Sequence, residues 1–261
     1  MASSSLTIAA SAPEMVRFGK AVGDETRLAI LRRLSLTDLR GGDMVEWLDI
    51  PHNALSYHLK YLRDLGLVSD HRSSADARDI YYQLDLRRLR GLFAALGDTL
   101  QVGSDMLLGS LAAPGTADRP LRVLFLCTHN SARSQLAQGI AQQRGGTRIA
   151  AFSAGSEPTE IRPEALTLLR ERAVDTTGYR AKSLAEFADQ SFDYVVTVCD
   201  RVREVCPIFL GDPIHLHWSI PDPVQIDDDA DRMQAFSSVE AELELRIEHF
   251  LHVAVADGRP E

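Results

Sequence analysis

The chain has 261 residues, of which 45% are hydrophobic and 25% charged, and its formal net charge is −9. That length suits two domains of about 100 to 200 residues each, and that composition excludes a disordered tail. No apolar run approaches the roughly 18 residues of a membrane-spanning helix, and the opening MASSSLTIAASAP lacks the basic start and long apolar stretch of a signal peptide. We therefore expect a cytoplasmic protein with no membrane association.

Charge and cysteine are unevenly distributed. Residues 1–110 hold 13 basic and 14 acidic side chains, whereas residues 111–261 hold 15 and 23. The acidic balance argues against general coating of nucleic acid, but a near-neutral first half can still present a local basic face to phosphates. All three cysteines lie after residue 120. They are too few for a secreted disulfide scaffold, which favours a reducing compartment and a chemical role.

One segment, LGSLAAPGTADRP, has neither helical nor alternating periodicity and is rich in Gly, Pro, Ala and Ser. Such a composition is typical of a linker between folding units. The sequence shows no internal repeat. We expect a disordered start at 1–13, a first domain at 14–107, the linker at 108–120 and a second domain at 121–261.

The first domain follows the order helix, turn, helix and two-stranded wing. Asp24 is placed to cap the second helix, Pro51 opens the fourth, and Gly66 is a stop signal for it. This order is that of a winged helix-turn-helix, whose second helix of the pair enters the major groove of DNA. The predicted helices span residues 14–22, 24–34, 42–49 and 52–66, and the predicted strands span 67–72 and 79–84.

Helical periodicity divides the fourth helix into two faces. Leu55, Leu59 and Leu62 recur at helical spacing and predict a buried stripe. The opposite polar face can meet base edges or phosphates, and two arginines flanking the wing tip can clamp backbone phosphates. A merely solvated face is the alternative, and His58, close to the leucines, is interpreted as a packed histidine. The predicted DNA-binding residues are His52, Asn53, Ser56, Tyr57, Lys60, Arg72 and Arg78.

GDETRLAILRRL, ALSYHLKYLRDLGLV and the short wing together resemble the ArsR family of dimeric winged-helix repressors over residues 14–105. The resemblance implies a transcriptional regulator that binds operator DNA as a homodimer, with a helix within residues 84–109 packing against its twin. Arsenic-sensing members carry a cysteine pair where this chain has Arg40 and Gly42. Because arsenite prefers thiolate ligands, the usual sensor site is absent and no effector is predicted.

The second domain opens with LRVLFLC, an apolar run typical of a buried parallel strand, followed by a helix start. Cys127 and Arg133 bracket a C-x5-R loop whose backbone N–H groups and helix N-terminus would converge on an oxyanion. The positive helix end and Arg133 are expected to lower the pKa of the Cys127 thiol and make it a nucleophile. A buried structural cysteine is the alternative, but it requires neither the arginine nor the small polar residues between.

FDYVVTVC predicts another buried strand, ending at Cys199, and Cys206 follows seven residues later. Two thiols at this spacing can form a disulfide if the intervening turn loosens. They could instead ligate zinc, but no second cysteine pair exists. The nearby His215 and His217 alternate on a predicted strand, where histidine is more often packed or exposed than ligating. We predict no metal site.

HWSIPDPVQ places Asp222 between two prolines in a rigid turn. A carboxyl held there could protonate an oxygen leaving from an anion in the Cys127 loop, although turn chemistry alone also explains an aspartate at this place. The acidic run at 227–231 is assigned to a solvated helix start, and the amphipathic stretch at 241–256 is expected to cover the sheet.

Four separated motifs, VLFLCTHNSARSQLAQG, AFSAGSEP, VVTVCDRVREVCP and HWSIPDP, resemble the low-molecular-weight phosphatase superfamily and, within it, the thioredoxin-coupled arsenate reductases. The resemblance implies an α/β domain with a four-stranded parallel sheet flanked by helices. The expected fold is thus multi-domain, an α+β winged helix followed by this α/β domain. Gln138 replaces an acidic residue of members with a potassium site, so no metal is expected.

The same resemblance assigns roles in the site. It makes Cys127 the nucleophile, Asp222 the acid, and Cys199 and Cys206 a redox relay reduced by external thioredoxin or another thiol, with arsenate as substrate and no bound cofactor. Asn130 would order the loop and Ser134 would stabilise the thiolate. The implied oxyanion-binding residues are Thr128, His129, Asn130, Ser131, Ala132, Arg133 and Ser134.

Two other functions remain open from the sequence. A protein-tyrosine phosphatase would use the same loop and Asp222, but such phosphatases usually follow the Asp-Pro with aromatic residues, where this chain has Val224 and Gln225. A non-catalytic repressor would use the cysteines only to bind arsenite or to report redox state. Arsenate turnover would distinguish the reductase from both.

Overall fold

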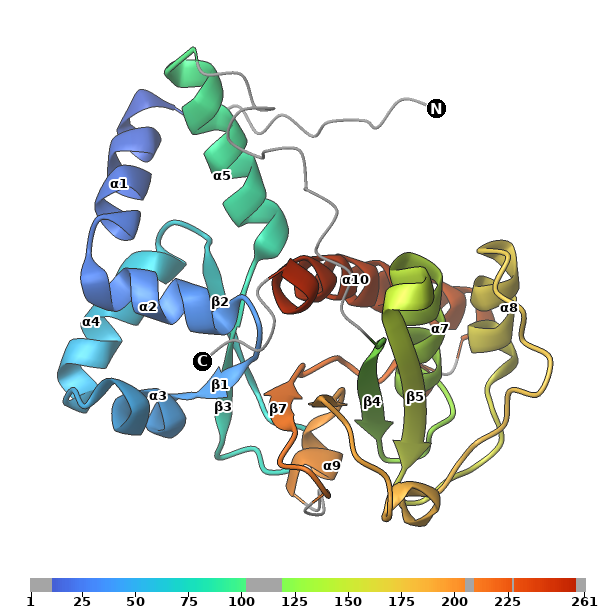
Figure 1. Cartoon of the computed structure of the whole chain (residues 1–261). Coiled ribbons are helices and arrows are strands. Elements are labelled where there is room, and N and C mark those ends of the chain that lie inside the picture. The colour runs from blue at the N-terminus through green and yellow to red at the C-terminus, as the bar shows by residue number, and fades with distance from the viewer. Residues whose placement is uncertain (1–10, 102–118, 205–208, 227, 257–261) are drawn as a thin grey trace. The chain divides into compact units, whose positions relative to one another are not determined.

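The computed structural model describes residues 11–101, 119–204, 209–226 and 228–256. These residues form two compact units, the first containing residues 11–72 and 78–101, and the second containing the residues from 119 onward together with the short segment 73–77 (Figure 1). Residues 1–10 of the expected disordered start, residues 108–118 of the expected linker, and Cys206 lie outside the described residues. The expectation of disorder up to residue 13 is wrong at its end, because Ser11 caps a helix that begins at Ala12. Among the residues that are described, no helix has both the length and the apolar character needed to cross a membrane.

The first unit is a winged helix-turn-helix, as predicted. Its sheet has the order β1-β3-β2 and is antiparallel throughout. The two-residue strand β1 is not predicted by the sequence, because so short a run carries no alternation. The helices are α1 (Ala12–Val22), α2 (Glu25–Leu34), α3 (Gly41–Leu48), α4 (His52–Arg63) and α5 (Leu86–Thr99), and the strands are β1 (Leu39–Arg40), β2 (Val68–Arg72) and β3 (Ile80–Leu84).

Local signals set the ends of these helices. Asp24 caps α2 by accepting a hydrogen bond from the Arg27 backbone N–H at 2.9 Å, as predicted. The helix α4 ends at Arg63, three residues earlier than predicted. Its last turn closes on Gly66, whose φ of +66° lies in the left-handed region that glycine adopts without strain. The stop signal is therefore confirmed, but the turn that carries it lies outside the helix.

The second unit has the predicted four-stranded parallel sheet, and its strand order is β5-β4-β6-β7. The expected strand end at Cys199 is wrong, because β6 ends at Thr197 and leaves the cysteine in the following turn. The strands are β4 (Leu121–Cys127), β5 (Ile149–Gly155), β6 (Tyr194–Thr197) and β7 (Ile214–His217). The helices are α7 (Arg133–Gly145), α8 (Pro163–Glu171), α9 (Asp200–Glu204) and α10 (Asp229–Ala256), with 3-10 turns η1 (Gly146–Arg148), η2 (Leu184–Phe187) and η3 (Pro223–Gln225).

Helices pack on this sheet and enclose its core. The helix α7 packs along β4 and β5, and α10 lies beside α7 (Figure 1). The Phe250 ring of α10 meets the Tyr194 ring of β6 edge-on, with the ring centroids 4.9 Å apart. The C-terminal helix therefore covers the sheet, as its amphipathic pattern predicts, and it begins at Asp229 within the acidic run.

Candidate functional site

Strand register brings two cysteines to one edge of the sheet. The strands β4 and β6 are parallel neighbours, with Leu126 opposite Thr197. Cys127 is the last residue of β4 and Cys199 follows β6 by two residues, so both emerge at the carboxyl ends of adjacent strands. Both are buried, and the Thr128 hydroxyl lies 3.4 Å from the Cys199 sulfur. The loop after Cys127 thus touches the second thiol directly.

Two groups donate towards the Cys127 sulfur. The Asn130 backbone N–H donates to it at 3.2 Å, and the Ser134 hydroxyl lies 3.0 Å away. The Asn130 side-chain amide donates to that same hydroxyl oxygen at 2.8 Å. Because the oxygen of Ser134 accepts from Asn130, its proton is left for the sulfur. Two donors converging on one sulfur suit a thiolate.

The backbone of the loop is held by a segment in which the sequence marks no site residue. Asn130 has a φ of +47°, in the left-handed region that asparagine tolerates. Beyond it, the residues 157–162 act as a strap that binds loop carbonyls from outside. The N–H groups of Glu157, Thr159 and Arg162 donate to the carbonyls of Thr128, His129 and Ser131 at 2.9, 3.0 and 2.9 Å.

Arg133 and Asp222 complete the loop. One guanidinium nitrogen of Arg133 donates to the Ile220 carbonyl at 3.0 Å, and the other lies 3.0 Å from the Asp222 carboxylate. The Asp222 carboxylate also accepts from the Val224 N–H at 3.2 Å and so caps η3. The structure therefore brings together the cysteine, the arginine and the aspartate that the sequence singles out.

Cys199 is a buried thiol next to positive charge. Burial raises its pKa above the ordinary value, while the Arg133 charge acts in the opposite direction. The neighbouring Cys127 also raises the pKa of Cys199, since two thiolates repel each other. Burial and the neighbouring Cys127 thus favour the protonated form of Cys199, and the Arg133 charge opposes them.

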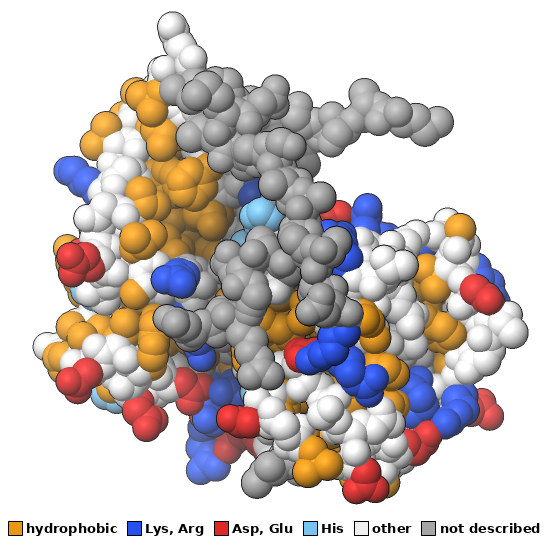
Figure 2. Space-filling view, in the orientation of Figure 1, with side chains coloured by type: hydrophobic (Ala, Val, Ile, Leu, Met, Phe, Trp, Pro, Cys, Tyr) orange, Lys and Arg blue, Asp and Glu red, His pale blue; other side chains and the backbone are white. Residues whose placement is uncertain are grey.

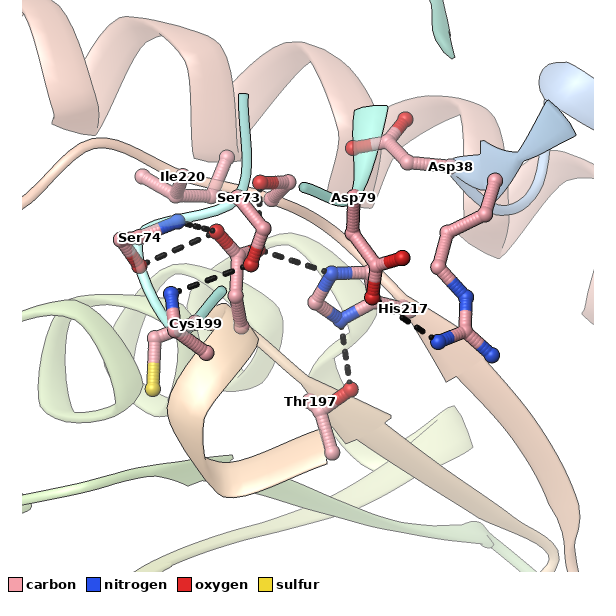
Figure 3. Close-up of polar contacts among 12 residues, drawn as sticks. Asp38, Ser73, Ser74, Asp79, Thr197, Cys199, His217 and Ile220 are labelled. Atoms are coloured by element: carbon pink, nitrogen blue, oxygen red, sulfur yellow. Dashed lines mark hydrogen bonds and ion pairs between the residues drawn. The ribbon is translucent and has the colours of Figure 1, made fainter. Parts of the chain in front are cut away.

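A buried polar cluster supports the turn that carries Cys199 (Figure 3). His217 lies between the Thr197 hydroxyl, 2.8 Å from its Nδ1, and the Asp200 carboxylate, 3.1 Å from its Nε2. Burial opposes ionisation of Asp200, but hydrogen bonds from His217 and Ser219 hold its pKa well below the usual range. His217 is therefore packed, as its position on a strand predicts, and His215 on the same strand is exposed.

Residues 122–258 match the protein family described as low molecular weight phosphotyrosine protein phosphatase. The chain belongs to this family. Its phosphatase-family domain is 28% identical over 130 residues to the glutaredoxin arsenate reductase of Synechocystis sp., covering 50% of this chain and 95% of that protein. It is 31% identical over 129 residues to the arsenate reductase of Halalkalibacterium halodurans, covering 49% and 93%.

One solved structure is also similar to this chain. It is a thioredoxin-dependent arsenate reductase of Corynebacterium glutamicum, which is 21% identical to this chain with a TM-score of 0.41. The match covers 85% of this chain and 98% of that one. In the first unit, residues 24–70 match the family described as bacterial regulatory protein, arsR family. The chain thus joins an arsR-type helix-turn-helix to a phosphatase-family domain.

The first unit presents the predicted polar face of α4. Leu55, Leu59 and Leu62 are buried, and the opposite side chains of this helix are exposed. His58 is half-buried, with its Nδ1 3.6 Å from the Asp24 carboxylate, so it packs as predicted. Arg40, where arsenic sensors have a thiolate, instead pairs with Asp43 and Asp79. The exposed residues of the predicted DNA-binding set are His52, Asn53, Ser56, Tyr57, Lys60, Arg72 and Arg78.

Proposed function

We propose that the chain is an arsenic-resistance protein whose second unit reduces arsenate to arsenite and whose first unit binds operator DNA. The buried Cys199 thiol beside the Cys127 loop carries this proposal, because reduction of an oxyanion needs a second thiol and hydrolysis of a phosphate ester does not. Curated relatives over nearly their full length are named arsenate reductases, which supports the same substrate. Oxyanion binding is assigned to Thr128, His129, Asn130, Ser131, Ala132, Arg133 and Ser134.

The first step is attack on arsenic. Arsenate binds in the loop, where Arg133 leaves its ion pair with Asp222 to contact the anion. The Asp222 carboxylate, once released from Arg133, takes up a proton from solvent. The Cys127 thiolate then forms a bond to arsenic while one arsenic–oxygen bond breaks, and Asp222 gives its proton to the departing hydroxyl, which leaves as water. A covalent adduct of the cysteine sulfur with As(V) remains.

The second step reduces arsenic. The Cys199 sulfur attacks the Cys127 sulfur and gives up its thiol proton to an oxygen of the departing arsenic group. The electron pair of the sulfur–arsenic bond passes to arsenic, which leaves as arsenite, As(III). The two sulfurs are oxidised to a Cys127–Cys199 disulfide. Cys206 then attacks Cys199 and frees the Cys127 thiolate, and an external dithiol such as thioredoxin, or another thiol, reduces the Cys199–Cys206 disulfide by exchange.

The site lacks the feature that favours a phosphatase. Val224 and Gln225 follow Asp222 and Pro223 in η3, so no aromatic side chain of this turn is available to stack on a phosphoaryl ring. Hydrolysis by this loop would need only Cys127, Arg133 and Asp222 and would leave Cys199 without a role. The reductase therefore accounts for more of the site.

The test is arsenate-dependent NADPH oxidation by the purified chain with thioredoxin and thioredoxin reductase. Cys127→Ser and Cys199→Ser should abolish turnover, and Cys206→Ser should allow one turnover and block the next. Hydrolysis of a phosphoaryl substrate that survives the loss of both Cys199 and Cys206, without arsenate turnover in the parent, would replace the proposal by the phosphatase. Operator affinity that changes with arsenite, again without turnover, would replace it by the sensor.

The first unit is proposed to act as a dimer on operator DNA. The helices α1 and α5 carry apolar side chains on their exposed surface (Figure 2), among them Val16 at 59% and Phe93 at 37% exposure, and Leu100, which follows α5, is 61% exposed. A second copy is the occupant that the arsR-type match favours, because such an apolar face is costly in water. Sedimentation should show a dimer that Val16→Glu together with Leu100→Glu converts to a monomer, whereas an unchanged mass would exclude this face.

A further inference from the structure

Gln135 is a polar residue with no solvent exposure, in the first turn of α7, and no step above uses it. Its side-chain nitrogen donates to the Asn130 carbonyl at 3.0 Å and to the Asn130 side-chain oxygen at 2.9 Å. It also donates to the Arg180 carbonyl at 2.9 Å. One amide group therefore ties the Cys127 loop to a segment 45 residues further along the chain.

The orientation of this amide is determined by its surroundings. Three acceptor oxygens surround the nitrogen of Gln135. Its oxygen is buried and has no hydrogen-bond partner among the described residues. Rotation of the amide by 180° would set that oxygen against three other oxygens, so the donor must face the loop. The protein tolerates a buried unpaired acceptor in order to place a donor at Asn130.

The side-chain N–H of Gln135 in turn fixes the orientation of the Asn130 side-chain amide. The Asn130 side-chain oxygen accepts from both Gln135 and the Lys182 backbone N–H, the latter at 2.8 Å. Its nitrogen must then face the Ser134 hydroxyl oxygen, to which it donates. A hydroxyl oxygen that already accepts this bond has its own proton available for the Cys127 sulfur, 3.0 Å away. The hydrogen bonds form one directed series from Gln135 to the nucleophile.

We propose that Gln135 is a positioning residue for the Cys127 thiolate, acting through Asn130 and Ser134. Without the Gln135 donor, the Asn130 side-chain oxygen keeps only the Lys182 N–H as a donor. The amide that donates to Ser134 is then held less firmly, and the Ser134 proton is less firmly directed at the Cys127 sulfur. The proposal rests on Cys127 being the reactive thiol of the proposed function. It concerns how the thiolate is stabilised, and not which oxyanion is reduced.

The test measures the thiolate itself. In a Cys199→Ser, Cys206→Ser background Cys127 is the sole cysteine of the chain. The rate of its alkylation by iodoacetamide is measured against pH for the parent and for Gln135→Leu. We expect the midpoint of this profile to move up by about one pH unit, which makes alkylation about tenfold slower well below the midpoint. An unchanged midpoint in a folded Gln135→Leu protein would overturn the proposal.

Matched variants separate positioning from general damage. Gln142→Leu removes an exposed amide from the same helix, which donates to the Ala151 carbonyl at 3.2 Å rather than to the loop, and should leave the midpoint unchanged. In a Ser134→Ala background, Gln135→Leu should add no further shift, because its effect passes through that hydroxyl. Additive shifts, or an equal shift in Gln142→Leu, would show that Gln135 is merely structural.

If Gln135→Leu fails to fold, Gln135→Met, which is unbranched and closer in shape, carries the same comparison. Alkylation needs neither arsenate nor a reductant. A shifted midpoint in a chain that does not reduce arsenate would therefore uphold the role of Gln135 and reject the reductase, and turnover with an unshifted midpoint would do the reverse.

Discussion

The polar face of α4 and the loop after Cys127 are both proposed to meet tetrahedral oxyanions, and they are built in opposite ways. On α4 the side chains are exposed and bond to their own helix or just beyond it, as Ser56 does with the His52 carbonyl and Lys60 with Asp64. In the loop 127–134 every residue except His129 is buried, and its contacts come from the strap, from the 180–182 segment and from α7.

The difference follows from what each surface must do. Donors that stabilise charge during a reaction have to be oriented beforehand, because reorientation in the transition state adds to the barrier. Side chains that contact DNA phosphates need only be long enough to reach them, because many such contacts together position the protein on the duplex and no single one is decisive. A substitution on the polar face of α4 should therefore reduce DNA affinity by a modest factor. A substitution in the loop should instead displace the donors around Cys127 and reduce the reaction rate more strongly.

The largest effect on stability is expected within α4 itself. Leu59 is 2% exposed, so Leu59→Ala should lower the free energy of unfolding of the first unit by about 2 to 5 kcal/mol. Tyr57 is 64% exposed, so Tyr57→Ala should change it by about 0.5 kcal/mol or less. Urea unfolding followed by circular dichroism measures both.

The same pair also tests the DNA-binding face. Tyr57→Ala should weaken binding to the tightest duplex selected from a random library by about tenfold, without a change in fold. Fluorescence anisotropy at fixed salt measures this affinity. Equal DNA affinities for Tyr57→Ala and the parent would remove Tyr57 from the interface and reduce the exposed face to a solvated one.

Much of this architecture follows from local pattern. The apolar run at Leu121–Cys127, the leucine spacing of α4 and the cap at Asp24 each depend on neighbours in sequence, and each is found as predicted. Cys127, Arg133 and Asp222 stand out in the sequence because a thiol, a guanidinium and a carboxyl group in such motifs are conspicuous, and the structure places Arg133 against Asp222. The parts that bear chemistry on their side chains could thus be read from the sequence.

The supports of the loop could not be read in this way. The strap binds through backbone N–H groups, which every residue except proline possesses, so no residue type marks Glu157 or Thr159. Gln135 gives a faint signal, a polar residue among the apolar positions of a buried helix, but its partner Arg180 is set by the tertiary fold. The end of β6 before Cys199 likewise depends on pairing, because the apolar run itself continues.

The largest effect on activity is expected at a glycine beneath the loop. A Cβ on Gly155 would lie 2.6 Å from the Thr128 carbonyl oxygen and 2.8 Å from the Asn130 nitrogen, which are backbone atoms of the loop. Gly155→Ala should therefore displace the donors of Cys127 and lower kcat/KM for arsenate by about 100-fold, as misplacement by about 1 Å does. Steady-state kinetics measures it.

Gly42→Ala is the matched control, because a Cβ there meets nothing within 4 Å. It should leave arsenate turnover unchanged. If Gly155→Ala kept full activity, the loop would be able to adjust its backbone, and the contrast drawn with α4 would fail.

The smallest effect is expected at Lys182, whose backbone N–H supports Asn130 while its ammonium donates to the Arg180 carbonyl. Burial lowers the pKa of Lys182 to about 8 from an ordinary 10.5. The folded chain binds this proton less tightly than the unfolded chain, so a protonated Lys182 destabilises the fold. This penalty is complete below about pH 8 and disappears as the pH rises to 10.5.

Lys182→Met should then be more stable than the parent at pH 7, by about 1 kcal/mol or less after solvent screening. The advantage should vanish by pH 10.5, and urea unfolding at the two pH values measures it. If Lys182→Met were less stable than the parent at both pH values, the hydrogen bond from the ammonium to the Arg180 carbonyl would outweigh the cost of desolvating the ammonium. The Lys182 side chain would then support the loop as well as its backbone N–H does.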